Sequence, residues 1–370
     1  MKIIKPDYTN SIMNVSNSFL NHYNIKTDYP GIPLLDKELQ NNYDHIFYIL
    51  LDGMGVNVIN AHLDENDALR KYMRQSVTSV FPPTTVAATN AVLSALPPIT
   101  NGYLGWVQYF KEENSDIAVF LNKDFYTNEE LPEIVRDKYL SYDNIIKRIH
   151  KQNPDVITNQ FFPGFIEGSD TESFKDEIDK ALMVAHNTDQ SFSYLYWTQP
   201  DLFEHVHGTY SKEVKTVLKG LNKDFEDLLD NVPPNSMAVV IADHGLIDVE
   251  EINLFQYENL TNMLVRKPSI EPRAINFFVK EDKLIEFKEE FNTLFTGKYI
   301  LLSKDEVFKS NTFGEGVKHP LIDMFVGDYL GIAIDKYMFS LSGKKMYKAH
   351  HAGTSEEEMM VPLIIFTKNA

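Results

Sequence analysis

The sequence contains no cysteine among its 370 residues, which excludes disulfide bonds, zinc sites built on thiolates and cysteine nucleophiles. It also lacks a long hydrophobic run, because no stretch approaches the roughly 18 apolar residues of a membrane-spanning helix. The N-terminus, MKIIKPDYTN, has neither the apolar segment nor the small-residue cleavage site of a signal peptide. We therefore expect a cytoplasmic protein that does not associate with a membrane.

Positive charge is scarce as well. The chain has 35 Lys and Arg against 53 Asp and Glu, a formal net charge of −18. This balance argues against nucleic acid or an anionic membrane as a partner. A phosphate-bearing substrate would need local positive charge, and metal ions are the evident source. The length suits one large α/β domain or two ordinary ones, and it leaves the oligomeric state open.

What the sequence does contain begins with the stretch SVFPPTTVAATN, residues 79–90. Its two prolines cannot continue a β-ladder or a helix interior, but they can precede a helix start. The small residues after Thr85 suit a tightly packed helix. A threonine hydroxyl at this position therefore sits at a helix N-terminus, where free N–H groups and the helix dipole favour an anion. Both a nucleophile that attacks phosphorus and a plain N-cap fit the pattern.

Several polar residues follow strand-like segments. Apolar runs at 45–51, 191–197 and 236–242 predict strands, the first of them a buried parallel strand. Open α/β sheets place their sites at the carboxyl ends of such strands. Asp201 and His205 are four residues apart, so on a helical turn they share one face. The candidate site comprises Asp52, Thr85, Asp201, His205, Asp243, His244 and His351.

Three aspartates, three histidines and one hydroxyl supply enough donors for two metal sites. Oxygen and nitrogen ligands of this kind suit Zn²⁺, or Mn²⁺ where carboxylates dominate. Two ions about 4 Å apart can clamp the attacking and leaving oxygens of a phosphoryl transfer. Any one of these elements occurs by chance, but the ordered set indicates a phosphoryl-transfer site with two divalent metal ions.

The motifs in order are LLDGMG, SVFPPTTVAATN, QPDLFEH, IADHG and HHAGTSEEEMMVPL. From about Asp44 to the C-terminus the chain thereby resembles the alkaline phosphatase superfamily, specifically its type I phosphodiesterase/nucleotide pyrophosphatase family. The resemblance implies a single α/β hydrolase domain over residues 1–370. Its core would be a central, mostly parallel sheet flanked by helices.

The resemblance also implies a role for each candidate residue. Thr85, not Thr84, takes the position of the nucleophile that forms a covalent phospho-threonine. His351, not His350, directly precedes the small-residue and glycine step of the family. The implied ligands of the metal ion beside the nucleophile are Asp52, Asp243 and His244, and those of the other metal ion are Asp201, His205 and His351.

Two positions depart from the family pattern. Nucleotide pyrophosphatases usually carry an asparagine three residues after the nucleophile, where this chain has Ala88. They also place an asparagine at the end of the following glycine-containing loop to hold a phosphate oxygen. Here that loop reads TNGYLGW and ends in Trp106. The phosphate contact must then come from a backbone N–H, a water or another side chain.

The function expected from this reading is hydrolysis of a small phosphate ester or nucleotide, as a phosphodiesterase/nucleotide pyrophosphatase. A phosphomonoesterase or a phosphonate hydrolase of the same fold is the alternative, and a non-catalytic metal-binding protein is the alternative from another class. Turnover of a chromogenic diester separates the last from the enzymes. Four aromatic residues are candidates to stack on a base, with core packing as the alternative: Trp106, Tyr109, Tyr194 and Trp197.

The pattern changes after about Pro268. Residues 274–279, 283–296 and 299–303 read as strand, helix and strand with their own polar turns. This order predicts a small inserted α+β subdomain at 269–313. It lies in the chain between Asp243 and His351 and contributes no ligand of its own.

Overall fold

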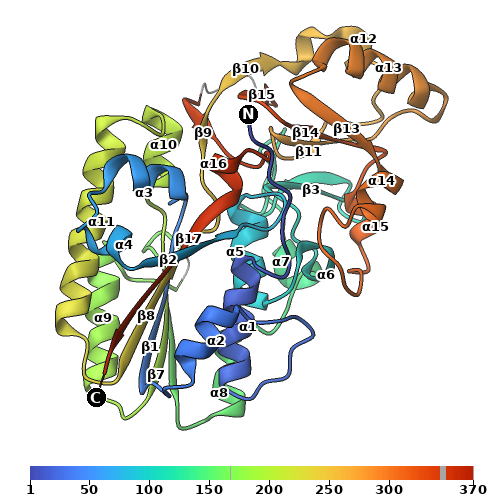
Figure 1. Cartoon of the computed structure of the whole chain (residues 1–370). Coiled ribbons are helices and arrows are strands. Elements are labelled where there is room, and N and C mark those ends of the chain that lie inside the picture. Colours follow the sequence, from blue (N-terminus) through green and yellow to red (C-terminus); the bar gives the residue numbers. More distant parts are fainter. Residues whose placement is uncertain (167, 342–346, 370) are drawn as a thin grey trace.

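The computed structural model describes residues 1–166, 168–341 and 347–369. A six-stranded sheet forms the centre of its larger part, and four of its neighbouring strands, β8, β1, β7 and β6, run parallel (Figure 1). β17 is antiparallel to both of its neighbours. In sheet order the strands are β2 (Met73–Thr78), β17 (Met360–Lys368), β8 (Ser236–Ile241), β1 (His45–Leu51), β7 (Ser191–Trp197) and β6 (Ile157–Phe161).

Sequence pattern and structure agree best in the centre of this sheet. β1 and β7 have the predicted bounds, and β8 ends one residue earlier than the predicted run. Every residue of β1 is buried because β1 has a strand on each side and helices over both faces. The central mostly parallel α/β sheet is therefore confirmed.

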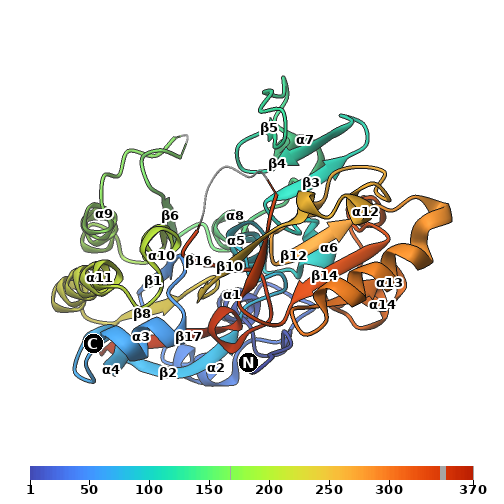
Figure 2. The same cartoon turned by 90° about the horizontal axis from the view of Figure 1, so that it is seen from above.

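Helices cover both faces of the six-stranded sheet (Figures 1 and 2). On one face lie α1 (Ile12–His22), α2 (Pro33–Leu39), α5 (Thr85–Ser94) and α8 (Ile145–Gln152). On the other lie α3 (Val56–His62), α4 (Ala68–Lys71), α9 (Phe174–His186) and α11 (Lys212–Asn231).

A second sheet of seven strands is antiparallel throughout. Its order is β13 (Tyr299–Ser303), β14 (Tyr329–Ala333), β12 (Ala274–Phe277), β11 (Ser269–Ile270), β3 (Val107–Phe110), β4 (Ser115–Ala118) and β5 (Lys123–Asp124). The strands of 269–313 thus lie outside the six-stranded sheet, but they pair with strands from before and after that range. A separate subdomain with these bounds stays a prediction.

Shorter elements complete the chain. Two small sheets pair β10 (Glu250–Asn253) with β15 (Tyr337–Ser340), and β9 (Ile247–Asp248) with β16 (Ala349–His350). The short α-helices are α6 (Pro98–Asn101), α7 (Val135–Tyr139), α10 (Asp201–His207), α12 (Glu258–Thr261), α14 (Lys304–Lys309), α15 (Ile322–Phe325) and α16 (Glu356–Met359). The longer α13 (Leu284–Phe295) and the 3₁₀ turns η1 (Leu254–Gln256) and η2 (Glu281–Lys283) belong to the part around the second sheet.

The start of α5 lies where the two halves of the molecule meet. Phe81 and Val86, on either side of the two threonines, belong to the hydrophobic cluster of the second sheet. Ala87, Ala88 and Ala91 belong instead to the cluster of the six-stranded sheet. One helix N-terminus is therefore packed between both cores.

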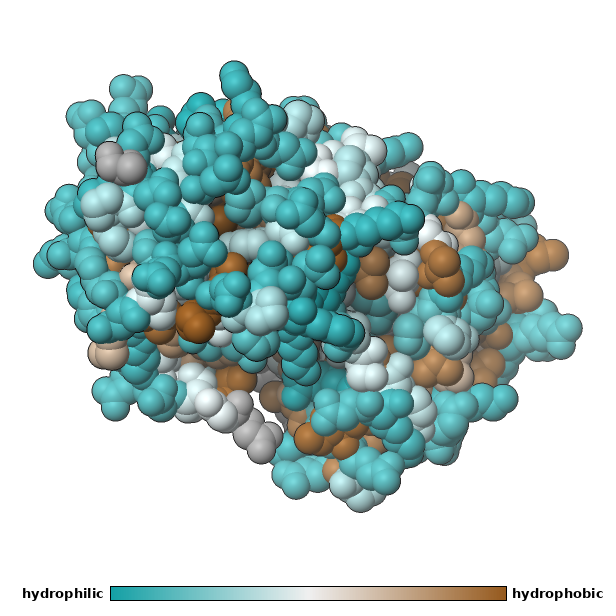
Figure 3. All heavy atoms as spheres, turned by 90° about the horizontal axis from the view of Figure 1, so that it is seen from below, coloured by the Kyte–Doolittle hydropathy of each residue, from teal (hydrophilic) through white to brown (hydrophobic). Residues whose placement is uncertain are grey.

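The outer surface fits the acidic composition. The face in Figure 3 is hydrophilic over most of its area, and its hydrophobic residues lie in separate patches. Across the ranges that the structure describes, no helix has the length and apolar character to cross a membrane.

A buried ion pair ties the second sheet to the first. Arg273, between β11 and β12, donates Nε to Glu358 Oε1 at 2.7 Å and Nη2 to Glu358 Oε2 at 2.8 Å. Both side chains are fully buried. Glu358 lies in α16, just before β17, and also accepts the Gly353 N–H at 2.7 Å. Such a pair is costly to break, because its remaining partner stays buried and uncompensated.

Replacing Arg273 by methionine should lower the free energy of unfolding by about 3–5 kcal/mol. The exposed pair Lys2–Glu356, with side chains 65% and 46% exposed, offers the matched control. Lys2→Met should cost less than about 1 kcal/mol. Urea unfolding of both variants measures the difference, and equal costs would contradict a structural role for the buried pair.

Candidate active site

Three aspartates meet at one edge of the six-stranded sheet. Asp52 follows β1, Asp243 comes soon after β8, and Asp201 opens α10 after β7. Because β1 lies between β8 and β7, the carboxyl ends of these strands are adjacent. The Asp201 N–H donates to the Asp52 carbonyl at 3.0 Å, which joins two of these loops directly.

Gly53 makes the close approach possible. It has a φ of +76°, and a Cβ there would lie 2.7 Å from the Asp201 Cα. Its N–H donates to Asp243 Oδ1 at 3.0 Å, and the His244 N–H donates to the same oxygen at 2.9 Å. Only a residue without a side chain fits this turn, which fixes all three aspartates together.

The two adjacent threonines point to different partners, as their spacing on a helix start predicts. Thr85 is the first residue of α5, and its Oγ1 lies 3.2 Å from His244 Nε2. The same Oγ1 lies 3.4 Å and 3.5 Å from the two Asp52 carboxylate oxygens. Thr84 occupies the N-cap position but makes no side-chain cap bond. Its hydroxyl donates instead to Glu271 Oε1 at 2.6 Å.

One group of possible metal ligands lies directly beside Thr85. Asp52, Asp243 and His244 each offer a donor atom within 4.8 Å of the others, and all three are buried. The Tyr196 hydroxyl donates to Asp52 Oδ2 at 2.5 Å and orients that carboxylate. This group matches the ligand set expected for the metal ion beside the nucleophile.

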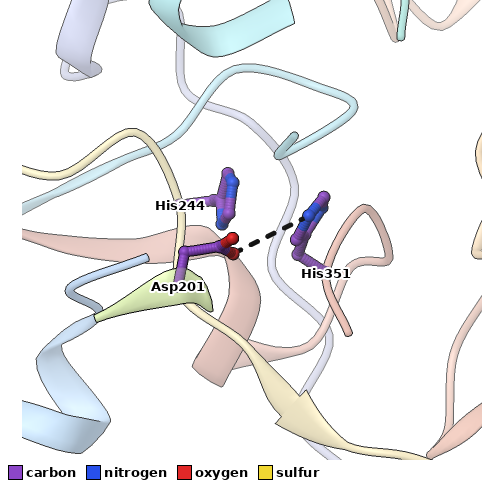
Figure 4. Close-up of side chains that lie close together, drawn as sticks. All are labelled: Asp201, His244 and His351. Carbon is purple, nitrogen blue, oxygen red and sulfur yellow. Dashed lines mark ion pairs between the residues drawn. The ribbon is translucent and has the colours of Figure 1, made fainter. Parts of the chain in front are cut away.

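A second group comprises Asp201, His244 and His351, again within 4.8 Å of one another (Figure 4). The expected set had His205 in place of His244. His205 lies next to the group, with its Nε2 3.4 Å from Asp201 Oδ1 and its Nδ1 2.8 Å from the Ala349 carbonyl oxygen. A ring held through Nδ1–H in this way leaves Nε2 free to bind a metal. His244 adjoins both groups, since its ring centre is 4.0 Å from that of His351.

Several donor atoms in this cluster are buried without a hydrogen-bond partner. Within the described residues they are Asp201 Oδ1, Asp243 Oδ2 and His351 Nδ1. Buried polar atoms are almost always paired, so several unpaired ones within one cluster need an explanation. A divalent cation supplies one, and the donor set fits such an ion.

Burial shifts the charges of the cluster. It raises the pKa of Asp201 and of Asp243 to about 7, and together with the charge of Asp243 it raises the pKa of Asp52 well above its usual range. Burial lowers the pKa of His244 to about 3, and burial with the neighbouring His244 lowers that of His351 well below its usual range. Neutral imidazoles are the metal-binding form, and the carboxylates need a cation to stay charged.

Three residues at the site are not among the seven candidates predicted from the sequence: Tyr196, Glu204 and Glu271. Glu204 lies on α10, is fully buried, and has no hydrogen bond on either carboxylate oxygen within the described chain. Glu271 comes from the second sheet, 187 residues from its partner Thr84. The strand pattern places Tyr196 one residue before the end of β7, but contact with Asp52 depends on side-chain packing across the sheet.

Burial decides between base stacking and core packing for two of the four aromatic candidates. Tyr194 is fully buried, and Tyr109, 8% exposed, lies under the Arg266 guanidinium, so both have packing roles. Trp106 and Trp197 are half-buried. His350 holds the His351 N–H through its Nδ1 at 3.0 Å.

Comparison with known proteins assigns the sequence to a family. The sequence profile of the family described as type I phosphodiesterase/nucleotide pyrophosphatase matches residues 46–306, more than half of the chain. The chain belongs to this family. It is a phosphoester hydrolase of the alkaline phosphatase superfamily. No curated protein sequence matches it significantly.

Solved structures show the same fold for this family member. The inactive threonine-to-alanine variant of murine ectonucleotide pyrophosphatase/phosphodiesterase 5, in complex with AMP, is 14% identical with a TM-score of 0.66; the match covers 88% of this chain and 89% of that one. The human protein is also 14% identical, with a TM-score of 0.64 and coverages of 88% and 89%. Phosphonoacetate hydrolase from Sinorhizobium meliloti 1021, in complex with phosphonoformate, is 12% identical, with a TM-score of 0.61 and coverages of 86% and 89%.

The Tyr196 hydroxyl allows a test of metal binding that keeps the packing of the sheet. Tyr196→Phe should weaken the binding of Zn²⁺ or Mn²⁺ by about 10–100-fold, because residues that orient a ligand have effects of this size. Tyr48→Phe is the control, since Tyr48 is also a buried tyrosine of the sheet and its hydroxyl contacts Ser16, which is not a candidate ligand. Isothermal titration calorimetry measures both metal affinities. An equal loss in the two variants would contradict the assignment of Tyr196 as the residue that orients Asp52.

Proposed function

We propose that this enzyme hydrolyses phosphate esters, as a phosphodiesterase/nucleotide pyrophosphatase, through a covalent phospho-threonine at Thr85 and with two divalent metal ions. The observation that carries the proposal is the position of Thr85 Oγ1, 3.2 Å from His244 Nε2 and 3.4 Å from Asp52 Oδ2 at the start of α5. That position places a hydroxyl at the start of a helix beside a buried group of side chains able to bind a metal ion.

The ligands divide between the two metal ions as the family motifs imply. Asp52, Asp243 and His244 would hold the ion beside Thr85, and Asp201, His205 and His351 would hold the other. His244 lies close to both groups, and the free Nε2 of His205 supports its place in the second set. Zn²⁺ suits this mixed nitrogen and oxygen set, and Mn²⁺ is the alternative.

The bound ions would lower the pKa of the Thr85 hydroxyl and neutralise charge on the phosphoryl oxygens. Thr85 Oγ1 attacks phosphorus, the bond to the leaving oxygen breaks, and a phospho-threonine forms. Water then cleaves the phosphorus–Oγ1 bond and restores the hydroxyl. The first N–H groups of α5 have no partner within the helix and receive no cap from Thr84, so they can donate to phosphoryl oxygens.

The substrate would be a small phosphate ester or a nucleotide. The murine neighbour binds AMP and is inactive as a threonine-to-alanine variant, which supports an essential threonine in this fold. The bacterial neighbour is a phosphonoacetate hydrolase, which favours a phosphonate as the second candidate. A screen of monoesters, diesters and phosphonates with one metal-replete preparation separates these, and turnover of none would favour a non-catalytic metal-binding protein. A cytoplasmic location belongs to the same proposal.

Thr85→Ala should abolish turnover, with a loss of about 10⁴-fold or more in kcat, because the nucleophile is gone. Thr85→Ser should keep measurable activity, since it keeps a hydroxyl in the same place. Single-turnover trapping with a labelled diester, followed by peptide mapping, should place the phosphate on Thr85. Label on Thr84, or full activity in Thr85→Ala, would show that the nucleophile is misassigned.

Metal-replete protein should contain two ions per chain, because the donors exceed what one four-coordinate site can use. Asp243→Ala should remove one ion and nearly all activity while the sheet stays folded. Elemental analysis gives the stoichiometry, and circular dichroism checks the fold. One ion in the unmodified protein would refute the two-metal arrangement, and unfolding of the variant would show that Asp243 is chiefly structural.

A further inference from the structure

Glu271 joins the second sheet to the residue that precedes the nucleophile. It lies in the turn between β11 and β12 and is 2% exposed. Its Oε1 accepts the Thr84 hydroxyl at 2.6 Å and the Trp106 N–H at 2.7 Å. One carboxylate oxygen thus holds both the position before Thr85 and the loop that leads into β3.

Close packing holds this carboxylate in place. A Cβ on Gly105 would lie 3.2 Å from Glu271 Cγ and 2.8 Å from Ile270 Cγ2, so the loop runs directly against the β11–β12 turn. Val86, one residue beyond the nucleophile, packs in the same hydrophobic cluster as Ile270. The start of α5 is therefore fixed against the second sheet by packing on one side and by Glu271 on the other.

The Thr84 side chain makes this contact instead of capping its own helix. A threonine at an N-cap normally uses its side-chain oxygen on the N–H groups of its own helix. Here the hydroxyl turns away to Glu271, and the first turn of α5 receives no side-chain cap. The Trp106 N–H is engaged in the same way, so it is not free to contact a phosphate oxygen.

We propose that Glu271 is a positioning residue for phosphoryl transfer. By holding Thr84 and the Trp106 amide, it keeps Thr85 Oγ1 beside His244 and Asp52 in the position needed for attack on phosphorus. The inference rests on the proposed role of Thr85. A displacement of about 1 Å at a reacting atom costs on the order of 10²-fold in rate, so loss of this contact should lower the chemical step more than substrate binding.

Two pairs of variants test the contact from both ends. Glu271→Ala and Thr84→Val remove it, whereas Glu271→Gln keeps an acceptor oxygen and Thr84→Ser keeps the hydroxyl. We expect Glu271→Ala and Thr84→Val to lower kcat by about 10–100-fold with KM and metal content nearly unchanged. Glu271→Gln and Thr84→Ser should retain most of the kcat of the unmodified enzyme. The double variant should lose less than the product of the two single losses, because both remove the same contact.

Glu177→Ala is the matched control, since Glu177 is a buried glutamate that bonds to Thr171 rather than to the site. Its kcat should stay within about two-fold of the unmodified enzyme. If Glu271→Ala fails to fold, Thr84→Val alone tests the contact, since it removes one hydroxyl with almost no change in side-chain volume. A kcat within two-fold in folded Thr84→Val, or losses that multiply in the double variant, would overturn the inference.

The failure of the proposed function is distinguishable from the failure of this inference. Phosphate trapped elsewhere than on Thr85, or an unmodified enzyme without turnover, refutes the proposed function. Normal trapping on Thr85 with an unchanged kcat in folded Thr84→Val refutes only this inference. Amide hydrogen exchange of the peptide covering residues 82–94 needs no substrate, and its rate reports how firmly the start of α5 is held. Faster exchange in Glu271→Ala and Thr84→Val, but not in Glu177→Ala, supports the contact, and unchanged exchange in both contradicts it.

Discussion

The concentration of buried carboxylates at the edge of the six-stranded sheet is the constraint on which the site depends. Asp52 and Asp243 are 3% and 0% exposed, and Asp201 adjoins them through the Asp52 backbone. Three carboxylates cannot all remain charged in so little water without a positive partner. Among the described residues, the side chains that shift the pKa values of these carboxylates are other carboxylates, hydroxyls and His205, not lysine or arginine. Bound cations would therefore stabilise this part of the fold as well as supply its chemistry.

The second sheet holds that edge together from outside. Its β11–β12 turn places Glu271 on the start of α5 and, two residues later, Arg273 on Glu358. Glu358 in turn accepts the Gly353 N–H, two residues after His351. Ala352 between them has a φ of +86°, an uncommon value for a residue with a side chain, which the surrounding contacts must maintain. One turn of the second sheet thus fixes both the proposed nucleophile and a proposed metal ligand.

The sequence predicts the part of the site that local patterns encode. A run such as HIFYILL, followed by aspartate and glycine, specifies a buried strand and the loop at its end, and the bounds of β1 and β7 follow from composition alone. The spacing of Asp201 and His205 likewise specifies one helical face. The pattern of residues 131–135 predicts a helix, but the helix begins only at Val135, because Pro132 and the extended Ile134 delay it. The apolar run at 325–334 predicts a strand, but the strand begins only at Tyr329, since α15 ends at Phe325.

What local patterns do not encode is which distant segments meet. The range 269–313 shows its strands clearly, yet nothing in it predicts pairing with β3 and β14, since strand partners are chosen by the whole fold. For the same reason, the sequence does not predict that Glu271 lies at the site, or which group replaces the family's asparagine at the end of the loop that carries Trp106. A loop that ends in tryptophan offers no side-chain amide to a phosphate oxygen, and its backbone N–H is taken by Glu271. In the proposed reaction the phosphoryl oxygens would then contact the metal ions and the uncapped N–H groups of α5. An acidic residue of the second sheet thus determines which backbone donors remain available beside the first sheet.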